Sequence, residues 1–229
     1  MKNITNTIHS TRLRCIIGWL GLLLPWLVVL ILQYFPTSIS ATYYTQACAT
    51  FMIILGSASI LLFCYQGYDW LDDVINTVAG IAGLMICLFP CWVEGEGPKV
   101  GTFMLDMDTS NIVHCIGAGV FFGMLSINSL FRFTKTSGEM TPNKKKRNII
   151  YRVCGIGMLA SFAMFFLPDF HCRTWIIEAL ALFFFGISFL TKANRYPWLF
   201  ADTPSDIVTM FLGKITDDYD EEEDDDAQH

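Results

Sequence analysis

The stretch YRVCGIGMLASFAMFFLPDFHCRTWIIEALALFFFGISFL, residues 151–190, decides the fold, because it holds two apolar segments joined by a short polar turn. Each segment has about the length that an α-helix needs to cross a bilayer. A single carboxylate, Glu178, lies just inside the second segment. An ionisable group at membrane depth is costly unless it is paired or hydrated, so Glu178 marks a candidate functional site.

The composition of the whole chain agrees with a membrane protein. Of its 229 residues, 53% are hydrophobic and only 16% are charged, whereas soluble domains carry about a quarter charged residues. The apolar runs exclude a soluble domain and predict an all-α, polytopic bundle of six transmembrane helices. The predicted helices cover residues 16–35, 46–66, 73–91, 111–132, 149–167 and 173–191.

The basic residues predict the orientation of the bundle. Lys and Arg are concentrated in the N-terminal segment 1–15, between the fourth and fifth helices, and after the sixth helix. The alternate connections hold almost none: 36–45 has no base, and 92–110 has only Lys99. By the positive-inside rule, both termini are cytoplasmic. The expected location is the bacterial inner membrane, as a multi-pass protein.

Two segments follow the transmembrane domain, which is predicted to cover residues 16–191. Residues 192–216 read as a juxtamembrane amphipathic helix, which would lie on the inner membrane surface or pack under the bundle. Residues 217–229 form an acidic tail, with nine acids and no base in 217–226. Such a segment is predicted to be disordered, and it would attract a basic cytosolic protein or the chain's own NKKKR stretch at 143–147.

The predicted ligand pocket lies at the outer side of the bundle. Counted at about 1.5 Å per residue, His114 and Glu178 fall at similar depth in the outer third of the membrane, and we expect them to pair. The outer connection adds Ser40, Tyr43 and Tyr44. The tyrosines are either interfacial anchors or part of the entrance to the pocket.

Other polar and small residues have simpler interpretations. Asp69, Asp72 and Asp73 form an inner-face acidic cluster, which we expect to be a solvated cap at the positive end of the third helix. Glycines such as Gly119 and Gly123 are expected to let neighbouring helices approach closely. Cys91 and Cys172 lie in different outer connections and could form a disulfide if that side is oxidising.

Metal ligands and cofactor motifs are not evident in the sequence. The His114-Cys115 and His171-Cys172 pairs contain zinc-type ligands, but neither has a second ligand at a metal spacing. We expect no metal site, no cofactor and no catalytic residues. The expected partners are membrane lipids, a basic cytosolic protein at the acidic tail, and a second copy of the chain in a homo-oligomer, but no nucleic acid.

Several motifs resemble those of a group of uncharacterised bacterial six-helix membrane proteins. They are SISATYYT, GYDWLDDVINTVAGIAG, LFP, HCIGAGVFF, KKRNIIYRVCGIGML and WIIEALALFFFGISFLTK, and they cover most of residues 37–192. The resemblance implies a six-helix membrane protein with Ser40, Asp72, His114 and Glu178 at motif positions. A looser likeness to the alkaline-ceramidase and adiponectin-receptor superfamily would imply a metal-dependent hydrolase. This chain lacks that superfamily's HxxxH pair and has one intramembrane histidine.

Three functions remain open at this point. The first is an outward-facing pocket that binds or senses a lipid headgroup or a small molecule. The second is a membrane anchor or effector subunit that recruits a cytosolic partner through the acidic tail and inner loops, with a channel as a variant. The third is an intramembrane lipid hydrolase, although the nucleophile and metal that it would need are missing, so we expect no enzyme.

Overall fold

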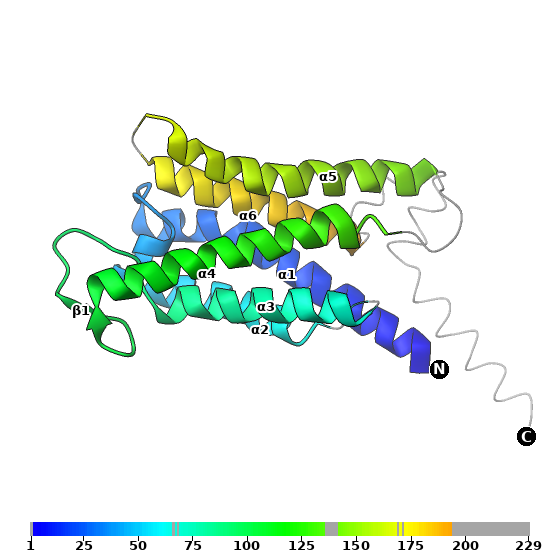
Figure 1. The fold of residues 1–229 in the computed structure, drawn as a ribbon, viewed down its shortest axis with the longest axis horizontal. Coiled ribbons are helices and arrows are strands. Elements are labelled where there is room, and N and C mark those ends of the chain that lie inside the picture. The colour runs from blue at the N-terminus through cyan, green and yellow to red at the C-terminus, as the bar shows by residue number, and fades with distance from the viewer. Residues whose placement is uncertain are drawn as a thin grey trace, which may run out of the picture.

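The computed structural model describes residues 2–65, 67, 69–135, 142–168, 170 and 172–193. The predicted juxtamembrane helix beyond residue 193 and the acidic tail lie outside the described residues. The described chain folds into long helices that lie side by side in one bundle (Figure 1). Their bounds are α1 (Lys2–Leu32), α2 (Cys48–Phe63), α3 (Trp70–Leu88), α4 (Met107–Ile127), α5 (Pro142–Ala163) and α6 (Arg173–Lys192).

Short elements connect or extend these helices. The 3-10 turn η1 (Ser40–Tyr44) lies between α1 and α2, and η3 (Met164–Phe166) continues α5. A small antiparallel hairpin, β1 (Lys99–Val100) and β2 (Leu105–Asp106), lies between α3 and α4. A π-helical turn, η2 (Asn128–Arg132), continues α4, and its last hydrogen bond runs from the Phe133 amide to the Asn128 carbonyl.

The helices form a ring in sequence order. Each helix from α1 to α6 packs against the next one in the chain, and α6 packs against α1 to close the ring. The interior is filled by aromatic side chains. The ring of Phe121 lies edge-on to Phe185, Phe185 to Phe189, and Phe189 to Phe133, with centroids 5.0–6.0 Å apart. Such edge-to-face pairs are favourable arrangements of buried aromatic rings.

The helix lengths are consistent with a multi-pass membrane protein. Among the described residues, five helices are long and apolar enough to cross a membrane. The helix predicted at 46–66 is shorter than expected, because α2 covers only 16 residues, which is roughly 24 Å at 1.5 Å per residue. The helix predicted at 149–167 begins earlier, at Pro142. Proline suits a first helical turn, and the lysines after it are good helix formers.

Glycines allow two helices to approach closely at some crossings, but not at every position where the sequence predicted it. A Cβ atom added to Gly186 of α6 would lie 2.7 Å from the Gly18 carbonyl oxygen of α1, so a side chain at this crossing has no space. In α3, a Cβ on Gly80 would lie 2.6 Å from the Ser59 carbonyl oxygen. The interpretation of Gly119 and Gly123 was wrong, because a Cβ there meets no atom of the described chain within 4 Å.

Alanine substitutions test whether the α1–α6 crossing needs glycine. Gly186→Ala should lower the free energy of unfolding by about 1–3 kcal/mol, because the new methyl group overlaps backbone that cannot move aside. Gly56→Ala is the matched control, since a Cβ at this position in α2 meets no described atom within 4 Å. It should be neutral or stabilising by about 0.5–1 kcal/mol, since alanine loses less backbone entropy in a helix. Unfolding in the same detergent compares them, and equal effects would contradict the tight crossing.

Candidate functional site

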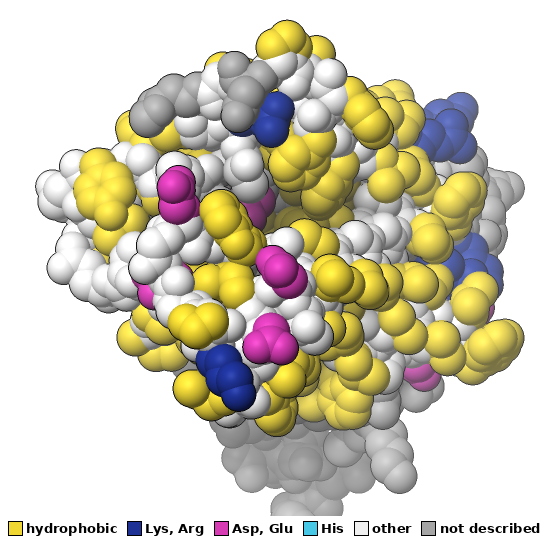
Figure 2. Space-filling view, turned by 60° about the vertical axis from the view of Figure 1, so that its left-hand side comes forward, with side chains coloured by type: hydrophobic (Ala, Val, Ile, Leu, Met, Phe, Trp, Pro, Cys, Tyr) yellow, Lys and Arg dark blue, Asp and Glu magenta, His cyan; other side chains and the backbone are white. Residues whose placement is uncertain are grey.

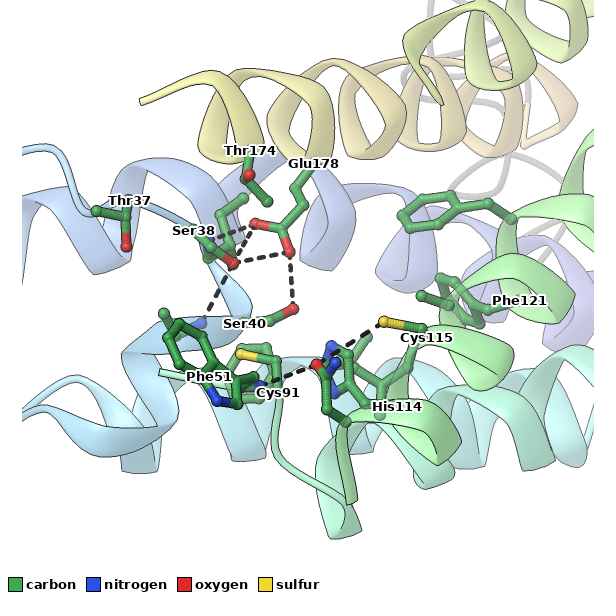
Figure 3. Close-up of a pocket in the computed structure, with 18 of the residues that line it drawn as sticks. Thr37, Ser38, Ser40, Phe51, Cys91, His114, Cys115, Phe121, Thr174 and Glu178 are labelled. Carbon is green, nitrogen blue, oxygen red and sulfur yellow. Dashed lines mark hydrogen bonds between the residues drawn. The ribbon is translucent and has the colours of Figure 1, made fainter. Parts of the chain in front are cut away.

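A cavity of about 980 Å³ lies inside the ring (Figure 3). It lies at the end of the bundle that carries the β-hairpin, and each of the six described helices contributes to its lining. Polar and apolar side chains both line it, and the polar ones come from more than one side, since Glu178 belongs to α6 and His114 to α4. The polar members include Ser38, Ser40, Asn111, His114, Thr174 and Glu178, and the apolar members include Leu24, Phe51, Phe121, Phe122, Phe162 and Leu182.

Glu178 is held by the connection that follows α1. Its carboxylate accepts hydrogen bonds from the Ser38 hydroxyl at 2.9 and 3.0 Å, the Ser40 hydroxyl at 2.8 Å, and the Ile39 amide (Figure 3). The same connection is tied to the start of α6 by the Trp175 amide, which donates to the Thr37 carbonyl at 3.0 Å. Residues 38–40 therefore form a cradle of donors around the acid, and this cradle fixes where the carboxylate faces the cavity.

His114 lines the same cavity but has a different partner. Its side chain is only 4% exposed, and Nδ1 lies 2.8 Å from the Phe89 carbonyl oxygen. Because a carbonyl oxygen only accepts, Nδ1 carries the proton, and the neutral ring has its free lone pair on Nε2. No hydrogen bond or ion pair joins His114 to Glu178 within the described chain, so the expected acid–imidazole pair is not formed. The two side chains share a cavity instead.

The two tyrosines of the outer connection pack against each other and against a loop, and they do not line the cavity. Tyr43 and Tyr44 are both described, and they lie outside the cavity lining. The Tyr44 hydroxyl donates to the Cys91 carbonyl at 3.0 Å, and its ring meets the ring of Tyr43 edge-on. Burial raises the pKa of Tyr44 to about 12, so its hydroxyl remains a donor. Tyr44 thus fixes the loop after α3, which forms part of the cavity wall.

Sequence reasoning missed several residues at the site, among them Ser38, Cys91, Asn111 and Thr174. Ser38 was not assigned to the pocket, although the SIS motif places it two residues before Ser40. Cys91 also lines the cavity, and burial, with a smaller contribution from the Glu178 carboxylate, raises the pKa of its thiol to about 12. Both Cys91 and Cys172 are free thiols in the structure, so the disulfide alternative is not formed.

At the opposite end of the bundle, the predicted acidic cluster is an ion-pair network. Asp69 caps α3, and its side chain accepts from the Asp72 amide. The Arg132 guanidinium bridges α4 to α3, because Nε bonds the Asp72 carboxylate and Nη2 bonds the Asp69 carboxylate. Lys135 adds a further ion pair to Asp69 at 2.9 Å. Lys135 and Arg132 hold the pKa of Asp69 well below its usual value.

This network corrects the expectation of a solvated cap. Asp72 is only 4% exposed, so it is a buried and paired carboxylate and not a hydrated one. The third acid, Asp73, accepts from the Gly67 amide at 2.7 Å. Behind the ion pairs, Asn128 donates to Asn76, which donates to the Asp72 carbonyl. The acids therefore join α3 to the end of α4.

Comparison with known proteins does not assign the chain to a family. No known family model matches the chain, and neither a curated protein nor a solved structure with significant similarity was found. The described residues contain no group of three or more His, Cys, Asp or Glu side chains placed to hold a metal ion. The resemblance to bacterial six-helix membrane proteins stays a prediction.

The ion-pair network predicts a clear ranking of two substitutions. Arg132→Met removes the guanidinium that bridges two carboxylates, and it should lower the free energy of unfolding by about 1–3 kcal/mol. Lys135→Met is the matched control, because its side chain is 56% exposed and touches only Asp69 in the network. Exposed ion pairs contribute little, so Lys135→Met should leave stability almost unchanged. Thermal or chemical unfolding in one detergent measures both, and equal losses would show that the network is hydrated.

Proposed function

We propose that this chain is a bacterial inner-membrane protein that binds or senses an amphiphile, meaning a lipid headgroup or an amphiphilic small molecule, in the cavity around Glu178. In this proposal, α1 to α6 all cross the membrane, both termini are cytoplasmic, and the cavity opens toward the outer side. The basic residues in the alternate connections support this orientation. The observation that carries the proposal is a carboxylate, held by protein donors, in the lining of a large cavity that also has many apolar side chains.

The mixed lining supports an amphiphilic ligand. Ser38, Ser40 and Glu178 offer hydrogen-bonding groups, while Phe51, Phe121 and other apolar side chains line the rest of the cavity. Ligand sites in proteins are mostly apolar, with a few polar groups that fix orientation. A headgroup beside Glu178 and an apolar tail along the phenylalanines would satisfy both kinds of lining.

The exposed part of the lining supports access from the membrane. Cys115 and Gly119 of α4 and Phe165 of η3 line the cavity, and all three are exposed. The cavity therefore reaches the outside of the bundle where α4 faces the end of α5. An apolar tail that enters there would remain in contact with lipid or protein along its whole path.

The packing of the interior favours binding over conduction. Phe121 forms the floor of the cavity, and the buried rings of Phe185, Phe189 and Phe133 continue from it toward the other end. An open channel would need a continuous polar path or a wide apolar one in this place. A closed floor suits a protein that holds its ligand at one end.

A leucine at the open part of the cavity tests this proposal. Gly119→Leu places a side chain where α4 lines the cavity, and a Cβ there meets no described atom within 4 Å, so the protein should still fold. Gly123→Leu is the matched control, one helical turn further along, with the same free space but outside the lining. Gly119→Leu should weaken amphiphile binding at least about tenfold, or about 1.4 kcal/mol.

Binding can be measured with a matched series of probes. Dodecylamine, dodecanol and dodecyl phosphate share one chain and differ in headgroup charge. Each radiolabelled probe is equilibrated with the protein in lipid nanodiscs, and retention by empty nanodiscs is subtracted. At least one probe should bind saturably to the wild type and to Gly123→Leu. The proposal fails if no probe binds saturably, or if Gly119→Leu binds every probe as the wild type does.

A further inference from the structure

We infer that the ligand of this cavity is a cationic amphiphile, with an ammonium group beside Glu178 and its apolar part along the aromatic wall. This inference rests on the proposed function, because it names the class of amphiphile that the same cavity takes. Three separate features of the site point to a cation: the charges of the lining, the direction of its hydrogen bonds, and the acids of the connection next to it.

The charges of the lining are one-sided. Among the described residues that line the cavity there are two carboxylates, Glu94 and Glu178, and no lysine or arginine. The base nearest to Glu178 in the sequence is Arg173, the first residue of α6. Arg173 lies outside the lining, and its guanidinium donates to the Leu167 carbonyl at 3.0 Å. The Arg173 guanidinium lies 5.8 Å from the ring centroid of Phe165, a lining residue, but no lysine or arginine of the described chain is itself in the lining. A phosphate or carboxylate headgroup beside Glu178 would therefore meet a like charge and no cation of the described lining.

The cradle around Glu178 suits a carboxylate that lacks a countercharge. The Ile39 amide can only donate, and the Ser38 and Ser40 hydroxyls are directed at the same two oxygens. These neutral donors stabilise the ionised acid, but they do not cancel its charge. A charge taken out of water needs an opposite charge nearby to offset the cost of burial. An ammonium group on the ligand would supply it.

The imidazole on the facing helix offers the same kind of contact. Nδ1 of His114 donates to the Phe89 carbonyl, so the neutral ring keeps one lone pair, on Nε2. Glu178 and, in its neutral form, His114 both carry acceptor atoms, and both residues line the cavity. A protonated amine has several N–H donors and no acceptor, which matches this arrangement.

The aromatic wall favours an organic cation over a metal ion. Phe51, Trp92, Phe121, Phe162 and Phe165 line the cavity. The faces of such rings attract ammonium groups and also pack well against hydrocarbon. A small metal ion would instead need several charged or neutral ligands at short distance, and the described residues contain no group of three or more His, Cys, Asp or Glu placed to hold one.

The connection that brings Glu94 into the lining carries a matching charge. The connection and first turn of α4, residues 89–110, contain four exposed acids and one base, Lys99; the acids are Glu94, Glu96, Asp106 and Asp108. The space-filling view shows acidic and also basic side chains on the face that has a recessed area (Figure 2). An excess of acids in a segment next to the cavity raises the local concentration of cations, so a cationic ligand would be drawn to the site.

The dodecyl series tests the headgroup class directly on the wild-type protein. Dodecylamine should bind at least about tenfold tighter than both dodecanol and dodecyl phosphate, because only the amine brings a charge opposite to Glu178. Glu178→Gln keeps the shape of the side chain and removes its charge, so the preference for the amine over the alcohol should fall to less than about threefold. Asp73→Asn is the control: this acid lies at the opposite end of the bundle, outside the lining, so the variant should keep the preference.

The outcomes separate this inference from the proposed function. If dodecanol or dodecyl phosphate binds as tightly as dodecylamine, and Gly119→Leu still weakens that binding, the cavity is an amphiphile site but the cationic ligand is overturned. If no probe binds saturably, both are overturned. If the amine preference persists in Glu178→Gln, with the protein showing the unfolding temperature of the wild type, the assignment of Glu178 as the counterion is wrong.

Discussion

A carboxylate inside the bundle cannot be left without partners, and the hydrogen bonds of Glu178 are the interaction on which this end of the molecule depends. The acid belongs to α6, while its donors belong to the connection between α1 and α2. These bonds therefore join the last described helix to the first ones. Together with the Trp175 amide on the Thr37 carbonyl, they hold the connection over the helix ends and leave the cavity beneath it.

The two ends of the bundle treat charge in opposite ways. At one end, Asp69 and Asp72 form ion pairs with Arg132 and Lys135, so these charges are paired within the protein. At the other end, the donors that the described chain gives to Glu178 are all neutral, and Glu178 lines the cavity. An acid that is already paired with a base of the protein gains little from a ligand's charge. An acid that is stabilised only by neutral donors can still form an ion pair with a cationic ligand. This contrast explains why the cavity, and not the acidic cluster, is the better candidate for function.

The sequence predicted the helices better than the contacts between polar groups. The periodic, apolar segments gave α6 almost to the residue, at 173–191 against Arg173–Lys192, because length and hydrophobicity suffice for such a helix. The partners of Glu178 and His114 could not be found in this way. They include the Ile39 amide and the Phe89 carbonyl, and backbone groups leave no mark on the identity of a residue. The depth of each residue along its helix placed the two side chains near one cavity. It could not show which groups would form hydrogen bonds with them.

The misplaced residues have a common physical cause. Tyr43 and Tyr44 lie in the correct connection, but the turn η1 directs them away from the cavity lining. Asp72 is buried because Arg132, 60 residues away in the chain, reaches it across the helix ends. In both cases the side chain's surroundings depend on a turn or a distant helix end. Short motifs carry little information about either of these.

The ring order of the helices has a consequence for biogenesis. Helices that neighbour one another in the chain can pair as soon as each is synthesised, since little chain separates them. The contact between α1 and α6 closes the ring, and it must wait until the chain has been made through residue 192. Because α6 also carries Glu178, the cavity acquires its charged group in that last docking step. A partly synthesised protein therefore lacks the complete cavity, which forms only when α6 has docked.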